Sequence, residues 1–270
     1  MLWSGRNWRP STVERVIETF RTSTRPAKVM TDQGAAFLKG MGNPAGNDAL
    51  ACELVAGELA HLIGLRVPEF AVIELDLTIQ MADRGPMHKG PAFVSRALTG
   101  ATGDGGDTFL ARLQKPEDVA KLVLFDSWIR NHDRAPPADA LTDYCNLDNL
   151  FFTPVARKYD LVALDHSHCF VEGELSAELS QPGVLTDDRI CGLFPEFQPF
   201  MDEAAVRQAA QAIAEVDEAS VREIVAAIPA AWEVPRATRD LWVDVIMTRG
   251  RLISAAGMEK LLEQRRLEFR

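Results

Sequence analysis

The sequence predicts an α+β fold in two lobes, with a small β-rich lobe at residues 1–99 and a larger helical lobe at residues 100–270. Three observations favour this division. Before residue 99 most apolar runs have the pattern of strands, and only one stretch has helical character. The segment Gly100–Asp107 contains four glycines and is typical of a flexible boundary. Beyond it, the apolar residues mainly follow the 3.6-residue period of helices.

In the first lobe, strands are expected where short apolar runs are bounded by turn residues. The first of them has the mixed alternation of a half-buried strand. Asp32-Gln33-Gly34 lies between two further runs and therefore predicts a hairpin. Asp48 is expected to cap the helix that follows, and Gly64 is expected to end it. The expected strands cover residues 13–20, 27–30, 35–41, 67–75 and 91–98, and the expected helix covers residues 49–63.

In the second lobe, a helix is expected to start at Pro116, because proline suits the first turn and apolar residues then recur at helical spacing up to Ile129. A β-rich lobe followed by a helical lobe is the order of a protein-kinase-like fold, although order alone does not establish function. The expected strands cover residues 150–153 and 160–164, and further helices are expected at 202–216, 218–228, 236–254 and 256–268.

Composition and charge exclude several classes of protein. The chain is 47% hydrophobic and 25% charged, as in ordinary soluble globular proteins. Its formal net charge of −10 argues against a direct, sequence-independent nucleic-acid partner, which would need a basic surface. No apolar run is long enough for a signal peptide or a membrane span. The four cysteines form no Cys-x-x-Cys pair, which favours reduced thiols in a cytoplasmic protein.

The polar residues of greatest chemical interest lie between residues 131 and 170. Asp133 follows a helix directly, where the helix dipole disfavours a carboxylate, and such a local conflict is a reason to expect a function. Asn146 and Asn149 both precede an apolar strand, and Asp165 follows the next one. An Asp at the end of a buried strand is a rigidly placed oxygen ligand of the kind that Mg²⁺ prefers.

Phosphoryl transfer requires this set of side chains. One carboxylate orients and deprotonates the attacking hydroxyl, while an amide and a second carboxylate hold Mg²⁺ against the phosphates. We therefore interpret Asp133 as the catalytic residue and Asp165 as one metal ligand. Either Asn149 or Asn146 is expected to be the other metal ligand.

Lys39 closes a predicted strand, and Glu53 lies in the helix that follows it. A lysine at a strand end is most often solvated. However, a carboxylate on the next helix can hold the ammonium group where it reaches a phosphate oxygen. The order of Lys39, Glu53 and the downstream Asp, Asn and Asp residues favours this second interpretation.

The same segment has features of two other types of chemistry. Asp165, His166 and His168 have a spacing that a transition metal can use, but only His132 offers a further histidine nearby. Ser167 lacks the nucleophile elbow of serine hydrolases. Arg134 is open to three interpretations, as a residue that stabilises the loop, as a phosphate ligand or as a surface cation.

At these residues the chain resembles the HipA-like kinase family, in particular its short, single-domain bacterial members. The resemblance covers roughly residues 13–170. It implies a two-lobed fold related to protein kinases and phosphatidylinositol kinases, with ATP and Mg²⁺ as cofactors. It also implies roles for individual residues: Lys39 as the phosphate-binding lysine, Glu53 as its partner, Asp133 as the catalytic aspartate, and Asp165 with Asn146 or Asn149 as metal ligands.

The resemblance implies two further contacts with the nucleotide. The turn Thr22–Pro26 stands where the family has its phosphate loop, so Ser23 and Thr24 are candidate phosphate contacts. Phe93–Arg96, with Ser95, stands where an interlobe hinge presents backbone to adenine. The chain departs from the family pattern in two places, because the turn has no glycine and because an insert, residues 135–145, separates Asp133 from Asn149.

The resulting hypothesis is an ATP- and Mg²⁺-dependent kinase. The resemblance favours transfer of the γ-phosphoryl group to a Ser or Thr hydroxyl of a protein, and a small-molecule hydroxyl is an alternative. An antitoxin-like protein is a candidate partner, whose existence the sequence does not decide. There are two competing hypotheses. The first is a pseudokinase that binds nucleotide without catalysis, which the glycine-free turn and the insert motivate. The second is an antibiotic-type small-molecule phosphotransferase.

Overall fold

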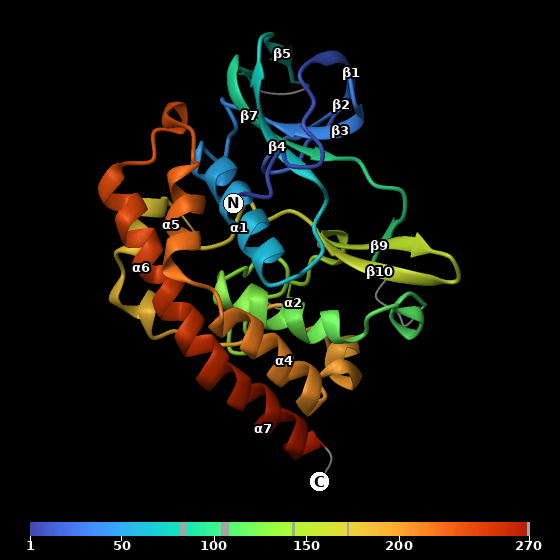
Figure 1. Cartoon of the computed structure of the whole chain (residues 1–270), viewed down its shortest axis with the longest axis vertical. Coiled ribbons are helices and arrows are strands. Elements are labelled where there is room, and N and C mark those ends of the chain that lie inside the picture. Colours follow the sequence, from blue (N-terminus) through green and yellow to red (C-terminus); the bar gives the residue numbers. More distant parts are fainter. Residues whose placement is uncertain (82–84, 104–107, 142–143, 172, 269–270) are drawn as a thin grey trace.

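The fold was described from a computed structural model, which covers residues 1–81, 85–103, 108–141, 144–171 and 173–268. An antiparallel sheet occupies one end of the molecule and helices occupy the other (Figure 1). The predicted α+β fold, with a β-rich N-terminal part and a helical C-terminal part, is confirmed. Within the described ranges, no helix has both the length and the apolar character needed to cross a bilayer.

The larger sheet has five antiparallel strands in the order β1-β2-β3-β7-β4. The predicted hairpin at Asp32-Gln33 is confirmed, since Thr31 pairs with Gly34. The first strand was expected to be half-buried, but five of its seven residues are exposed because it lies at the sheet edge. The strands are β1 (Val13–Thr19), β2 (Ala27–Thr31), β3 (Gly34–Lys39), β7 (Gly90–Arg96) and β4 (Phe70–Leu75); a short pair, β5 (Ile79–Gln80) and β6 (Pro86–Met87), was not predicted.

Helix α1 (Asp48–Leu62) lies between the sheet and the helical part of the molecule (Figure 1). Every residue from Ala49 to Ala60 is buried, because the helix packs against both parts. Asp48 was expected to be the N-cap, and this was wrong. Asn47 occupies the cap position, and the Asp48 carboxylate accepts a hydrogen bond from the Leu175 backbone N–H at 3.1 Å.

A second sheet, of three antiparallel strands, joins the two parts of the fold. Its order is β10-β9-β8, and the short strand β8 was not predicted. It falls inside the segment expected to be a flexible boundary, of which residues 104–107 lie outside the described ranges. The strands are β8 (Ala101–Thr102), β9 (Leu150–Val155) and β10 (Lys158–Ala163).

The helical part packs around α2 (Glu117–Trp128), which contacts α4 and α6. Trp128 donates a hydrogen bond from Nε1 to the Ile246 carbonyl at 2.8 Å. Trp232 is buried and donates to the Pro91 carbonyl of β7 at 2.9 Å, so the C-terminal half also touches the first sheet. The remaining helices are α3 (Leu175–Leu179), α4 (Glu203–Ala214), α5 (Glu218–Ala226), α6 (Arg236–Leu252), a π-helical turn (Ile253–Gly257) and α7 (Met258–Glu268), with 3₁₀ turns at Leu110–Arg112, Leu147–Asn149, Pro182–Leu185, Pro195–Phe200 and Ala230–Trp232.

Arg134 is fully buried and is the centre of a polar network at the end of α2. Its Nε donates to Asp126 at 2.7 Å, and Asp126 also accepts from the Asn131 side chain at 3.0 Å. The guanidinium further donates to the backbone carbonyls of Asn149 and Leu164. Of the three interpretations of Arg134, the structure therefore supports the residue that stabilises the loop.

Burial raises the pKa of Asp126 and outweighs the opposing effect of Arg134. The carboxylate is thus costly to keep ionised even with its partner present. Removing the partner leaves this cost without compensation, so the stability of the fold and the arrangement of the loop depend on one ion pair.

We expect Arg134→Met to lower the free energy of unfolding by about 3–5 kcal/mol at pH 7, because it leaves Asp126 buried and unpaired. Without Arg134 the folded-state pKa of Asp126 rises further above its unfolded value of about 4. The folded variant then binds the proton more tightly than the unfolded chain, so its stability increases as the pH falls through the folded-state pKa. Urea unfolding at pH 7 and pH 5 measures both effects.

The control is Arg157→Met, which alters an exposed arginine between β9 and β10. Adding Asp126→Asn to Arg134→Met should recover a large part of the loss, since the buried group is then uncharged. If Arg134→Met lowered the free energy of unfolding by less than about 1 kcal/mol, with no dependence on pH, the importance of the ion pair would be contradicted.

Candidate active site

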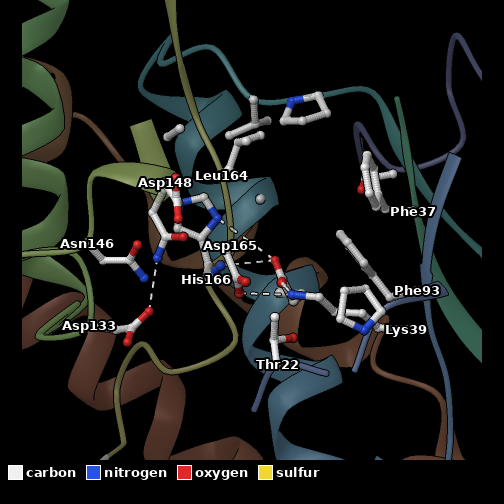
Figure 2. Close-up of a pocket in the computed structure, with 18 of the residues that line it drawn as sticks. Thr22, Phe37, Lys39, Phe93, Asp133, Asn146, Asp148, Leu164, Asp165 and His166 are labelled. Atoms are coloured by element: carbon white, nitrogen blue, oxygen red, sulfur yellow. Dashed lines mark hydrogen bonds and ion pairs between the residues drawn. The ribbon is translucent and has the colours of Figure 1, made fainter. Parts of the chain in front are cut away.

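A cavity of about 510 Å³ lies between the five-stranded sheet and the β9–β10 segment. The side chains of Lys39, Asp133, Asn146 and Asp165 all face it (Figure 2). Residues that are distant in the sequence thus line one cavity. The cavity is lined by Thr22, Ser23, Pro26, Phe37, Lys39, Glu53, Gly57, Val67, Pro68, Phe70, Phe93, Ser95, Asp133, Tyr144, Asn146, Asp148, Asn149, Ala163, Leu164, Asp165 and His166.

Lys39 is held at the end of β3 by three acceptors. Its Nζ forms an ion pair with Glu53, lies 2.9 Å from Asp165 Oδ1, and donates to Ser167 Oγ at 2.7 Å. Burial alone would lower the pKa of Lys39, but the charges of Asp165 and Glu53 outweigh it and raise the pKa above its ordinary value. Lys39 therefore remains a cation at the wall of the cavity, and the predicted pairing with Glu53 is present.

Glu53 connects helix α1 to the segment that follows β10. It accepts from Lys39 and Ser167 through Oε1, and from the His166 backbone N–H through Oε2 at 3.2 Å. Only 5% of Glu53 is exposed, so all of these bonds lie in a desolvated environment. Sequence reasoning missed Ser167, which it considered only as a nucleophile. Its position two residues after Asp165 was the available signal.

Asp165 emerges from the end of β10 with a positive φ of 51°. Burial would raise the pKa of its carboxyl group, but the Lys39 ammonium and the hydrogen bonds from Lys39 and Ser167 hold it well below the usual range. Its side chain is 36% exposed, against 6% for Glu53. Asp165 is thus an ionised carboxylate that also reaches the open part of the cavity.

The insert between Asp133 and Asn149 does not separate these residues in space. The Asn146 backbone N–H donates to the Arg134 carbonyl at 2.8 Å, which closes residues 135–145 into a loop. The Asn149 side chain donates from Nδ2 to Asp133 Oδ2 at 2.9 Å. Thr142 and Asp143 of the insert lie outside the described ranges. In Figure 2, Asn146 lies beside Asp133. Asp165 lies between this pair of residues and Lys39 in the same view.

The alternative metal trio of Asp165, His166 and His168 does not form. In the part of the chain that the structure describes, no group of three His, Cys, Asp or Glu residues is arranged to hold a metal ion. Burial and the charge of Arg134 lower the pKa of His166 to about 3, so its ring is neutral. His166 Nε2 lies 3.2 Å from Arg134, and His168 Nε2 lies 3.0 Å from the Ser23 hydroxyl in the β1–β2 turn.

The two further contacts expected from the resemblance are only partly in position. Thr22 and Ser23 of the β1–β2 turn line the cavity, but Thr24 is 1% exposed and is not among the lining residues. Phe93–Arg96 was expected to present hinge backbone. It lies instead in β7, which pairs with β3 on one side and β4 on the other, so its backbone is engaged within the sheet. Ser95 remains in the cavity wall.

The part of the cavity under the sheet is mainly apolar. Phe70 and Phe93 stack with ring centroids 5.5 Å apart, and Phe37 and Leu164 also line the cavity. Gly57 of α1 makes room for the Phe70 ring, because a Cβ atom at this position would lie 2.8 Å from Phe70 Cζ. An apolar slot beside a cluster of charged groups suits a ligand with a flat ring at one end and anionic groups at the other.

Comparisons with known proteins show the fold and the family of the chain. The chain can be superposed on the crystal structure of a Helicobacter pylori proinflammatory kinase, CtkA, with a TM-score of 0.56 at 12% sequence identity. The match covers 94% of this chain and 96% of the other, and at this identity it concerns the fold alone. No curated protein sequence matches significantly. A family model described as HipA-like kinase matches residues 13–253, and the chain therefore belongs to the HipA-like kinase family.

Proposed function

We propose that this kinase transfers the γ-phosphoryl group of ATP to a Ser or Thr hydroxyl of a protein and that it depends on Mg²⁺. One observation carries the proposal. A buried lysine, held by Glu53 and Asp165, faces the same cavity as Asp133 and its hydrogen-bonded partner Asn149. This arrangement supplies a cation for phosphates, oxygen ligands for a metal and a carboxylate for the acceptor.

The cavity supports ATP as the nucleotide. Its aromatic and aliphatic wall offers a place for the adenine ring, and Ser95 adds a hydroxyl there. Lys39, Thr22 and Ser23 line the polar part, where they offer an ammonium group and hydroxyl donors to phosphate oxygens. Because the β1–β2 turn has no glycine, side chains rather than backbone N–H groups are proposed to bind the phosphate oxygens.

The donor set also fits a magnesium ion. Asp165 is ionised and partly exposed, and Asn149 uses its amide nitrogen toward Asp133, which leaves its amide oxygen for a cation. We therefore propose Asp165 and Asn149 as the protein ligands, with Asn146 outside the coordination sphere. When bound, Mg²⁺ neutralises charge on the phosphates and orients them.

Asp133 is proposed to orient the acceptor hydroxyl and to accept its proton. The carboxylate is partly exposed, and one of its oxygens already accepts the Asn149 amide. This bond fixes the carboxylate, so its other oxygen can face the acceptor in a defined direction. A cytoplasmic location is part of the proposal, because all four cysteines are free thiols.

We expect Lys39→Met to lower phosphoryl transfer from ATP by at least about 100-fold, because it removes the cation that faces the phosphates. Asp133→Asn should lower turnover by about 10²–10⁴-fold and leave the affinity for a fluorescent ATP analogue unchanged. Transfer to proteins is measured with labelled ATP, and mass spectrometry identifies the acceptor residue. Lys158→Met, an exposed lysine of β10, is the control.

Each alternative has its own outcome in this experiment. Nucleotide binding by the wild type without turnover, unaffected by Asp133→Ala, would show a non-catalytic binding module. Transfer to aminoglycosides or sugars but not to proteins would show a small-molecule phosphotransferase. Circular dichroism of the Lys39→Met variant checks that loss of activity is not loss of folding, and Lys39→Arg retains the charge if the first variant does not fold.

The two asparagines can be separated by their effect on the requirement for Mg²⁺. Asn149→Ala should raise the Mg²⁺ concentration for half-maximal turnover by about 10–100-fold, the usual effect of weakening a metal site. Asn146→Ala should change it by less than about threefold. A titration of turnover with MgCl₂ at saturating ATP gives both values. The reverse order of effects would assign the metal to Asn146.

A further inference from the structure

We propose that the mouth of the cavity contains a subsite for a positively charged group of the acceptor, formed by Asp148 and Tyr144. This inference rests on the proposed function, since it concerns the molecule whose hydroxyl is placed at Asp133. It adds a substrate class: acceptors with an ammonium or guanidinium group close to the hydroxyl that is phosphorylated.

The first argument comes from the charges around the cavity. Four carboxylates line it in the described part of the chain, from Glu53, Asp133, Asp148 and Asp165, whereas Lys39 is the one lysine or arginine among the described lining residues. Lys39 already compensates Glu53 and Asp165, and Asp133 accepts the Asn149 amide.

Asp148 differs from the other three carboxylates. It is exposed, and among the described residues it forms neither an ion pair nor a side-chain hydrogen bond. A carboxylate without a partner at the mouth of a binding cavity raises the local concentration of cations and disfavours anions. The acceptor end of the cavity is therefore expected to select for positive charge.

The second argument comes from Tyr144. Its side chain is 63% exposed, although large aromatic rings are usually well covered, and it still lines the cavity. Tyr144 and Asp148 lie on opposite sides of Asn146 in the sequence. The face of an aromatic ring attracts cations, and a carboxylate accepts hydrogen bonds from them, so the two groups together suit a guanidinium or ammonium group.

Tyr144 lies in the insert, residues 135–145, and Asp148 lies just beyond the insert, whose two ends are tied down by hydrogen bonds. The base of the insert is closed by the hydrogen bond from Asn146 to Arg134, and its start is held by a hydrogen bond from the Gly192 N–H to the Ala135 carbonyl at 2.8 Å. Asp139, an acidic residue of the insert, lies 3.7 Å from Arg189 and is thereby compensated. Among the described carboxylates that line the cavity, Asp148 is thus the one without a protein partner.

The main test compares acceptors with and without a cation. Phosphorylation of positional-scanning peptides, each with one Ser or Thr, is measured with Mg²⁺ and ATP. Kanamycin serves as the cationic small-molecule acceptor and glucose as the neutral one. We expect the wild type to prefer Arg or Lys near the acceptor, or kanamycin over glucose. Asp148→Asn should lower kcat/KM for the cationic acceptor by about tenfold or more and change that for the neutral one by less than about threefold.

Two more variants sharpen the test. Asp148→Lys should reverse the preference, so that acidic peptides are favoured, and the control Asp139→Asn, in the neighbouring insert, should leave the preference for cationic acceptors unchanged. Equal use of cationic and neutral acceptors by the wild type would overturn the inference. An equal fall for both acceptors in Asp148→Asn, together with a higher requirement for Mg²⁺, would overturn it as well and would assign Asp148 to the metal.

A binding measurement separates this inference from the proposed function. The probe is a labelled peptide with two arginines and Ala in place of the acceptor, measured by fluorescence anisotropy in the presence of a non-hydrolysable ATP analogue. Binding that is at least about tenfold tighter than for a neutral peptide, and that is lost in Asp148→Asn, supports the subsite even if no acceptor is phosphorylated. Equal binding of both peptides refutes the subsite, whether or not phosphoryl transfer occurs.

Discussion

The buried ion pair between Arg134 and Asp126 is the constraint on which the rest of the site depends. Through it, one guanidinium joins α2, the loop that carries Asp133, the backbone before β9 and the end of β10. Such a pair stabilises the fold little more than apolar residues in its place would, but removing one partner alone is strongly destabilising. Its value here is positional, because the segments that bear Asp133, Asn149 and Asp165 cannot move apart without leaving a buried charge uncompensated.

Lys39 provides a second constraint, and it acts between the two parts of the fold. The ammonium group joins β3 to α1 through Glu53 and to the segment after β10 through Asp165 and Ser167. These partners are not equivalent, since Glu53 is almost completely buried and Asp165 is 36% exposed. The pair with Asp165 is therefore the one that can be exchanged for a ligand, while the pair with Glu53 keeps the lysine in position.

The sequence revealed the parts of the site that depend on local pattern. Lys39, Glu53 and Asp165 each stand in or at the end of an element whose periodicity is clear, so both the element and the residue were predictable. Arg134 was ambiguous because burial depends on contacts with residues far away in the chain. Ser167 and strand β8 were missed for the same reason. The pairing of Phe93–Arg96 on both sides was not predictable either, because strand order, not strand pattern, determines which backbone is engaged.

The insert illustrates the difference between spacing in sequence and distance in space. Counted along the chain, it separates Asp133 from Asn149, yet the bond from Asn146 to the Arg134 carbonyl returns the chain to its starting point. An addition of this kind leaves the contact between Asp133 and Asn149, the residues proposed for phosphoryl transfer, intact and changes only what lies at the mouth of the cavity. Differences between this chain and its family are therefore expected in the choice of acceptor rather than in the chemistry.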